Sequence, residues 1–315
     1  MKNPKFSVCI PTYNRASSLK IAIESVLKQD FDDYEIIISD NNSTDNTKEM
    51  VGLFNNPKIK YFKNEENIGM IKNWNRTLEL AEGEYIAFLF DDDEFAPNHL
   101  KEAFKILNGH SNIGIYAVGN KENPRPITGI IDSKKYFQYI YKIENVSTPS
   151  ETIFKREFNN KKYFYNKNYN FCPEVELYLE IANDDFLAYH SPLQTVIRHS
   201  HAKSASHEQA FSWVPFADKF KIINKYKNHK YVNSNLYRKA VSLNINSAFE
   251  KYTVGRIQNI GDEKEIFEGI KKVLQKEFPF KYCKILMMKK IINIIAKYHL
   301  INIVKIKRIY HLLGK

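Results

Sequence analysis

Three consecutive aspartates, Asp91–Asp93, stand at the end of an apolar, β-prone run that begins at Tyr85. Such a run is typical of a strand buried on both faces, whose carboxyl end would deliver charge into a cleft. Neighbouring carboxylates repel one another, so a hard divalent cation with phosphate oxygens in its shell would neutralise them. The alternative is a solvated acidic turn whose aspartates cap a helix expected at Asn98–Leu107.

The segment after the first expected strand could contact a nucleotide. Phe6–Ile10 is typical of a short strand and runs into the loop Pro11–Arg15, which precedes a helical stretch at Ala16–Gln29. In this loop Tyr13 could stack on a base and Arg15 could offer phosphate a cationic fork. An ordinary surface loop with an exposed Tyr and Arg is the competing interpretation.

A second polar cluster follows the strand expected at Tyr34–Ser39. Asp40 and Asn41 stand at its carboxyl edge, where a base or ribose could be bound. A third strand is expected at Lys58–Phe62, followed by a helix that ends at Ala81. The alternation of strands with helices of about 10–15 residues predicts an α/β fold, with a parallel sheet and helices on both faces.

Composition limits the class of protein. The chain has 315 residues, 43% of them hydrophobic, which is enough for one large core and an accessory region. Its cysteines, Cys9, Cys172 and Cys283, are widely spaced and odd in number, so we expect neither a disulfide framework nor a cysteine-based metal site. This cysteine usage fits a protein of the reducing cytoplasm. We expect no signal peptide, because the N-terminus runs straight into a strand-like segment without an apolar h-region. We also expect no membrane span, because no window reaches roughly 18–20 apolar residues.

The net charge of +11 suits nucleic acid, anionic lipid or phosphorylated substrates as partners. Residues 281–315 include nine Lys or Arg and no Asp or Glu. No nucleic-acid-binding signature accompanies this excess, so nucleic acid is not an expected partner. The stretch 284–297 is typical of a basic amphipathic helix with Lys289, Lys290 and Lys297 on one arc. It either packs on the rest of the protein or lies on an anionic membrane surface.

Four ordered segments make the chain resemble the family 2 glycosyltransferases of the GT-A fold. They are Cys-Ile-Pro-Thr-Tyr-Asn-Arg at 9–15, Ile-Ser-Asp-Asn-Asn-Ser-Thr-Asp-Asn-Thr at 38–47, Asn-Ile-Gly at 67–69 and Glu-Gly-Glu-Tyr-Ile-Ala-Phe-Leu-Phe-Asp-Asp-Asp-Glu-Phe-Ala-Pro at 82–97. The resemblance is strong from residue 5 to about 110 and continues more loosely to about 206. Any one segment alone would be weak, but their order and spacing make the match specific.

The resemblance implies a nucleoside-diphosphate-sugar donor, a divalent metal (Mn or Mg) and inversion at the anomeric carbon. By position it assigns Tyr13 to the base, Asp91 to the ribose side and Asp92 to the metal. The implied donor-binding set is Pro11, Thr12, Tyr13, Arg15, Asp40, Asn41, Asp91 and Arg198, and the implied metal set is Asp92, Asp91, Asp93 and His201.

Two departures from the family pattern bear on these assignments. Many members have two adjacent aspartates where this chain has Asp40 and Asn41, and the second commonly contacts uracil, so the base is left open. The acidic motif is Phe-Asp-Asp-Asp rather than the common Asp-Ser-Asp-Asp. Its first carboxylate is missing, and the ligand set could be shifted by one residue.

Beyond residue 110 the informative segment is Phe171–Ala182, a helix-prone run that opens with carboxylates. Family members have an acidic catalytic base at the start of this helix. Glu174 falls on that position, with Glu176 as the reserve. An ordinary amphipathic helix with acidic residues in its first turn is the alternative interpretation.

The stretch Pro192–Ser204 resembles the segment that closes many members over the diphosphate. In it Arg198, His199 and His201 have side chains suited to a phosphate contact or a further metal ligand. Ordinary surface histidines are the alternative interpretation.

The sequence predicts two regions. A GT-A catalytic domain is expected at 1–206, with a nucleotide-sugar half at 5–110 and an acceptor and base half at 111–206. A helical, basic region is expected at 207–315.

The resemblance implies an inverting, metal-dependent glycosyltransferase, and the acidic run at Asp91–Asp93 suits the metal. The enzyme would move a sugar from a nucleoside-diphosphate donor to a glycan or lipid-linked oligosaccharide acceptor in surface polysaccharide synthesis. The alternatives are a nucleotidyltransferase, which the lack of a glycine-rich, lysine-containing loop at the first strand disfavours, and a non-catalytic sugar-nucleotide or glycan-binding subunit. We expect the protein in the cytoplasm, peripheral on the inner face of the cell membrane if its basic tail binds lipid.

Overall fold

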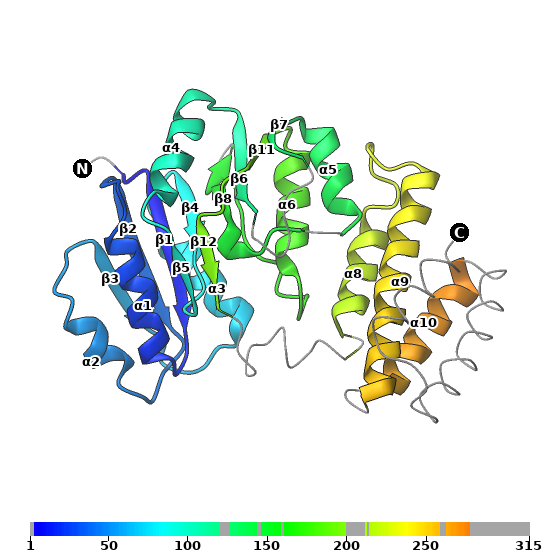
Figure 1. Ribbon diagram of the computed structural model, residues 1–315, viewed down its shortest axis with the longest axis horizontal. Coiled ribbons are helices and arrows are strands. Elements are labelled where there is room, and N and C mark those ends of the chain that lie inside the picture. Colours follow the sequence, from blue (N-terminus) through cyan, green and yellow to red (C-terminus); the bar gives the residue numbers. More distant parts are fainter. Residues whose placement is uncertain are drawn as a thin grey trace. The chain divides into compact units, whose positions relative to one another are not determined.

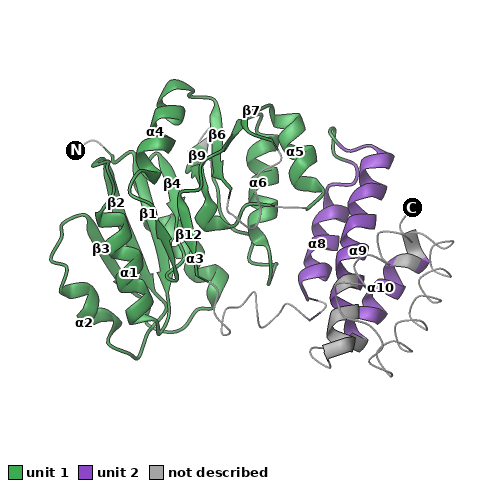
Figure 2. Ribbon diagram, in the orientation of Figure 1, with its two compact units in different colours: residues 1–200, 229–231 green, residues 201–228, 232–315 purple. Residues whose placement is uncertain are grey.

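The computed structural model of the chain describes residues 3–119, 127–143, 146–158, 161–199, 212, 214–258 and 263–277. Its contacts divide the chain into two compact units, residues 1–200 with 229–231 and residues 201–228 with 232–315 (Figure 2). The expected domain boundary at residue 206 lies outside the described residues and stays a prediction.

The first unit is built on an eight-stranded sheet of order β3-β2-β1-β4-β8-β6-β11-β7 (Figure 1). One half of the sheet is parallel, as its strand and helix alternation predicts. Its members are β1 (Phe6–Thr12), β2 (Tyr34–Asp40), β3 (Ile59–Lys63) and β4 (Tyr85–Phe88). The carboxyl ends of these strands therefore lie at one edge of the sheet.

Helices cover both faces of this parallel half. On one face Val8 and Ile10 lie in a core with Leu19 and Ile23 of α1 (Ala16–Leu27) and with apolar side chains of α4 (His99–Gly109). On the other face Cys9 Sγ donates to the carbonyl oxygen of Thr77 in α3 (Met70–Leu80), at 3.6 Å. Every residue of β1 and β2 is buried, which explains why these strands have long apolar runs rather than strict alternation.

The other half of the sheet is mixed. Strand β8 (Thr152–Lys155) runs antiparallel between β4 and β6 (Ile113–Val118). Strand β6 is parallel to β11 (Leu187–Ser191), and β7 (Gly129–Ile131) is antiparallel to β11. The whole sheet is thus mostly parallel but not purely so, as we expected for the GT-A fold.

The acidic run does not simply end a strand. Strand β4 stops at Phe88, the chain turns, and Asp93–Phe95 forms a short strand, β5. It pairs antiparallel with β12 (Val196–Arg198), which places Asp93 opposite Arg198. The alternative that the aspartates cap the next helix is wrong, because α4 has Asn98 as its N-cap.

The second unit is helical over its described residues, as the sequence predicts. It comprises α8 (Val214–Lys225), α9 (Ser234–Gln258) and α10 (Glu263–Glu277). Its interior includes a contact between the rings of Tyr252 and Phe267, with centroids 5.4 Å apart. The basic stretch 281–315 lies outside the described residues. Within the described ranges, every helix is too short or too polar to cross a bilayer.

Candidate active site

Two loops at the carboxyl edge of β1 and β2 are joined by hydrogen bonds. The backbone N–H of Asn14 donates to Ser43 Oγ at 2.8 Å, and Thr44 N–H donates to Asn14 Oδ1 at 2.7 Å. Asp45 Oδ2 accepts the backbone N–H of Ala16, the first residue of α1, at 3.1 Å. These bonds hold the backbone around Tyr13, whose own side chain is 44% exposed and free of the core.

Asp91 is a buried carboxylate held by residues from the first loop. Its Oδ2 accepts the hydroxyl of Thr12 at 2.7 Å, and its Oδ1 accepts Arg15 Nη1 at 3.0 Å. Burial raises the pKa of Asp91 to about 6, although Arg15 and Thr12 both act to lower it. Thr12 is itself buried at the end of β1, directly after the buried Pro11.

Asp92 shares the same guanidinium. Arg15 Nη1 lies 3.2 Å from Asp92 Oδ2, so a single nitrogen contacts two adjacent carboxylates. The side chains of Asp92 and Arg15 are 16% and 34% exposed, which leaves both accessible from solvent. This pair forms the open part of the acidic cluster.

Asp93 has a different set of partners. It is 4% exposed, and burial raises its pKa to about 6 against the lowering effects of the Ser150 hydroxyl, the Arg198 charge and the His199 backbone N–H. The three aspartates are therefore divided between two arginines, Arg15 for the first two and Arg198 for the third.

A short segment that the sequence interpretation missed organises this region. The 3-10 helix η1 (Pro149–Glu151) brings Ser150 and the buried Glu151 beside the acidic turn. Ser150 Oγ accepts the backbone N–H of Phe90 at 3.0 Å, and Glu151 Oε1 lies 3.8 Å from Arg198 Nη1. The signal was present, since Thr148–Glu151 has the residue spacing of a capping box with proline at the first turn. Of its two bonds, the Thr148 N–H donates to Glu151 Oε2 at 3.2 Å.

Asp40 uses its carboxylate within the fold. It is fully buried, and its Oδ1 accepts the backbone N–H of Ser43 at 2.7 Å while its Oδ2 accepts the hydroxyl of Tyr61. Both carboxylate oxygens thus hold neighbouring parts of the fold. A direct role for Asp40 toward base or ribose stays a prediction.

Asn41 joins the second loop to the segment before α3. Its Oδ1 accepts the backbone N–H of Ile68 at 2.9 Å, and its Nδ2 donates to Asn67 Oδ1 at 2.8 Å. An aspartate at this position could not donate to Asn67, which explains locally why this chain tolerates the departure from the family pattern. Its role toward the base also stays a prediction.

The two glutamates at the start of α6 (Pro173–Asn183) have different environments. Glu174 is half-buried, and its charge, added to the larger effect of burial, raises the pKa values of the interior Tyr165 and Tyr178. Glu176 is 1% exposed, and its Oε2 accepts Asn166 Nδ2 at 2.6 Å. Of the two, Glu174 is the one that solvent or an acceptor can reach.

The carboxylates fit one kind of metal site. Among the described residues, no three His, Cys, Asp or Glu side chains converge as a complete metal-binding group. Asp92 and Asp91 nevertheless offer hard oxygen donors of the kind that hold Mg²⁺ or Mn²⁺ when substrate phosphates supply further ligands. Asp93 is turned to Ser150 and Arg198, and His201 lies outside the described residues.

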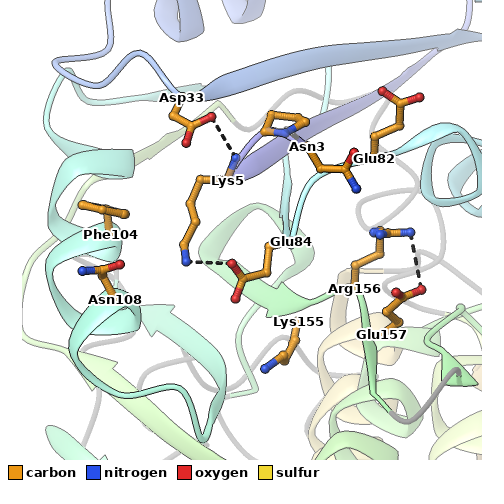
Figure 3. Close-up of a pocket in the computed structure, with 11 residues that line it drawn as sticks. Asn3, Lys5, Asp33, Glu82, Glu84, Phe104, Asn108, Lys155, Arg156 and Glu157 are labelled. Atoms are coloured by element: carbon orange, nitrogen blue, oxygen red, sulfur yellow. Dashed lines mark hydrogen bonds and ion pairs between the residues drawn. The ribbon is translucent and has the colours of Figure 1, made fainter. Parts of the chain in front are cut away.

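A hollow of about 660 Å³ lies at the opposite edge of the sheet and contains none of the predicted site residues (Figure 3). Its walls include Lys5, which precedes β1, and Glu84, which precedes β4. Lys5 Nζ and Glu84 Oε2 are 2.8 Å apart, and Arg156 Nη1 lies 3.5 Å from Glu157 Oε2. Because the hollow contains none of the predicted site residues and four of its charged side chains are paired with one another, it is not the candidate site.

Comparison with known proteins identifies the family to which the chain is similar. Residues 7–163 match the model of the family described as glycosyl transferase family 2. This match includes both loops, the acidic run and η1.

A curated relative is the GalNAc(5)-diNAcBac-PP-undecaprenol beta-1,3-glucosyltransferase of Campylobacter jejuni. It is 42% identical over 114 residues, which are 35% of this chain and 37% of the relative. The chain therefore aligns with well under two thirds of that protein's length.

Solved structures share the fold of this chain over most of its length. TarS 1–349 of S. aureus, in complex with UDP-GlcNAc, has a TM-score of 0.67 and 18% identity, covering 86% of this chain and 81% of that one. The mannosyltransferase PcManGT of Pyrobaculum calidifontis, in complex with GDP-Man and Mn²⁺, has a TM-score of 0.59 and 16% identity, covering 95% and 87%. At these identities the likeness bears on the fold, which is GT-A. With the match over residues 7–163, this chain belongs to glycosyl transferase family 2.

Proposed function

We propose that the carboxyl edge of β1, β2 and β4 binds a nucleoside-diphosphate sugar and transfers the sugar, with inversion, to a hydroxyl of a glycan or lipid-linked acceptor. The observation that carries this proposal is the cluster of Thr12, Arg15, Asp91 and Asp92, which joins the first loop to the acidic turn inside the matched family region. Ligands bind at this edge in open α/β sheets.

The donor would lie along the two joined loops. Tyr13 is exposed on a fixed backbone and offers a face for the base, while Arg15 and Arg198 flank the acidic cluster and offer cations to the diphosphate. Asp40 and Asn41 would act mainly by holding the loops in place, since both are buried and bonded within the protein.

Asp92, assisted by Asp91, would hold a divalent cation. When bound, Mn²⁺ or Mg²⁺ would supply positive charge against the diphosphate as its bond to the sugar breaks. Asp91 is fixed by Thr12, so it gives the more exposed Asp92 a rigid neighbour.

Glu174 would act as the general base. It is half-buried at the start of α6, where a carboxylate can accept the proton of an acceptor hydroxyl. Glu176, bonded to Asn166, would instead hold the loop that precedes the helix.

The acceptor proposal draws on the relative named as acting on a PP-undecaprenol-linked glycan. A lipid-linked acceptor would be presented at a membrane surface. The nine basic residues of 281–315 would then hold the enzyme at anionic lipid, as a peripheral protein on the inner face of the membrane.

Turnover of a panel of nucleotide sugars tests the proposal. Release of the nucleoside diphosphate should require one of these donors and a divalent ion, and should stop in excess EDTA. Asp92→Asn should lower the rate at least about 10²-fold, as loss of a principal electrostatic stabiliser does. Asp32→Asn, at a side chain 102% exposed, is the matched control and should keep the wild-type rate. Equal rates for all three proteins, or full activity in EDTA, would contradict the proposal.

A further inference from the structure

We propose that Arg15 is the resting counter-ion of Asp91 and Asp92 and is a positioning residue that couples metal binding to diphosphate binding. This inference rests on the proposed function of the same site. In it, the guanidinium holds the two carboxylates until a diphosphate attracts it away and a divalent cation takes its place.

The geometry places Arg15 where a cation is needed. One nitrogen, Nη1, lies 3.0 Å from Asp91 Oδ1 and 3.2 Å from Asp92 Oδ2. These are charge-assisted hydrogen bonds, which are stronger than neutral ones and expensive to leave unmade around a buried carboxylate. Arg15 therefore stabilises Asp91 and Asp92, whose carboxylates would otherwise repel each other.

In this geometry Arg15 and a divalent cation would compete for the carboxylates of Asp91 and Asp92. A divalent cation on Asp92, with Asp91 beside it, needs oxygen atoms that Arg15 now contacts. Two cations cannot approach the same pair of carboxylates closely without repulsion. Metal binding by the protein alone is therefore opposed by Arg15.

The side chain can move while the backbone stays in place. Asp45 Oδ2 holds the N–H of Ala16, and Asn14 is bonded to Ser43 and Thr44, so the backbone on both sides of Arg15 is fixed. The Arg15 side chain itself is 34% exposed. A rotation of that side chain toward solvent would break its contacts with both carboxylates and leave Asp91 bonded to Thr12.

A diphosphate is the partner that the released guanidinium suits best. The planar fork of arginine binds phosphate oxygens in a bidentate manner, and a diphosphate also supplies ligands to the cation that replaces Arg15. Each of the two ligands thus favours the other, and by linkage the effect is reciprocal.

The test measures Mn²⁺ binding rather than turnover. Free Mn²⁺ is followed by electron paramagnetic resonance in titrations of the full chain, first without nucleotide and then with UDP or GDP, correcting for Mn²⁺ bound by the free nucleotide. Three proteins are compared: wild type, Arg15→Gln, and the control Arg76→Gln, whose arginine pairs with Glu79 on the exposed face of α3.

We expect Arg15→Gln to bind Mn²⁺ alone about 10-fold more tightly than wild type, since an opposing charge has been removed. The nucleoside diphosphate should increase Mn²⁺ affinity strongly in wild type and in Arg76→Gln, and clearly less in Arg15→Gln. If circular dichroism shows that Arg15→Gln does not fold, Arg15→Lys replaces it and should show a smaller loss of coupling, because lysine keeps the charge without the planar fork.

Two outcomes separate this inference from the proposed function. Mn²⁺ binding by wild type with nucleotide, together with unchanged or weaker Mn²⁺ binding by Arg15→Gln alone, would overturn the role of Arg15 and leave the proposed function standing. Failure of all three proteins to bind Mn²⁺ with either nucleotide would overturn both.

Discussion

The hydroxyl of Thr12, the last residue of β1, donates a 2.7 Å hydrogen bond to Oδ2 of Asp91 in the turn after β4. Both residues are buried, and 79 positions separate them in the chain. This bond joins the first loop to the acidic turn, so it links the fold of the parallel strands to the geometry of the candidate site.

Replacing Thr12 with Val should destabilise the protein by about 1–3 kcal/mol, because it keeps the shape but leaves a buried carboxylate oxygen without its donor. The free energy of unfolding in urea measures the change. Thr44→Val, at an exposed position in the second loop, should cost less than about 0.5 kcal/mol. Equal losses of unfolding free energy in the two variants would show that the Thr12–Asp91 bond contributes no more to stability than the exposed Thr44 hydroxyl.

His99 should make stability fall in mild acid. It is buried at the start of α4, stacked on Phe95 with ring centroids 4.1 Å apart and bonded through Nδ1 to Thr195 Oγ1 at 2.7 Å. Burial lowers its pKa from 6.5 to about 3. Between these values the unfolded chain binds a proton at His99 that the folded protein does not, so His99 contributes a fall in unfolding free energy of up to about 1.4 kcal/mol per pH unit as pH decreases. The buried Asp91 and Asp93, whose pKa values are raised, contribute with the opposite sign.

His99→Gln removes that titration. The difference in unfolding free energy between wild type and His99→Gln should therefore change with pH from about pH 6.5 downward, with the slope against pH less positive in the variant. An unchanged slope would mean that His99 makes no contribution to the pH dependence of stability.

The roles of Glu174 and Glu176 should separate in kinetics and stability. Glu174→Gln should lower kcat strongly while nucleotide affinity and stability stay near wild type, since the side chain acts on the acceptor. Glu176→Gln should chiefly lower the melting temperature, because it alters a buried carboxylate bonded to Asn166. Wild-type turnover in Glu174→Gln with loss of turnover in a folded Glu176→Gln would move the base to the second residue.

The basic tail gives a prediction that depends on salt. Changing Lys289, Lys290 and Lys297 to Gln in the full chain should reduce sedimentation with anionic liposomes, since each basic residue near such a surface contributes on the order of 1 kcal/mol. Wild-type binding should weaken as salt rises. The matched control changes the exposed Lys48, Lys72 and Lys101 to Gln, which removes the same charge from the first unit. Equal sedimentation with neutral vesicles would contradict the membrane proposal.

The parallel half of the sheet could be predicted from local sequence because each strand is an apolar run bounded by polar or proline-containing loops. The expected strand at Phe6–Ile10 is observed as Phe6–Thr12, and the one at Tyr34–Ser39 as Tyr34–Asp40. Glu174 was likewise expected at the start of a helix, and α6 begins at Pro173.

The partners of the acidic run could not be predicted in this way. Arg15 is 76 positions from Asp91, and the pairing of β5 with β12 joins Asp93 to a strand of three residues. Neither a charge pair across such a distance nor so short a strand leaves a periodic pattern. Only the fold divides the three aspartates between Arg15 and Arg198.

The most direct test of the central claim is the change in melting temperature that a nucleoside diphosphate causes in the presence of Mn²⁺. At a ligand concentration of about 100 Kd, UDP or GDP should raise the melting temperature of the wild-type protein by about 5 °C or more. Asp92→Asn should lose most of that shift, and Asp32→Asn should keep it. A wild-type protein that no nucleoside diphosphate stabilises, or an Asp92→Asn variant that is stabilised as much as wild type, would contradict the account.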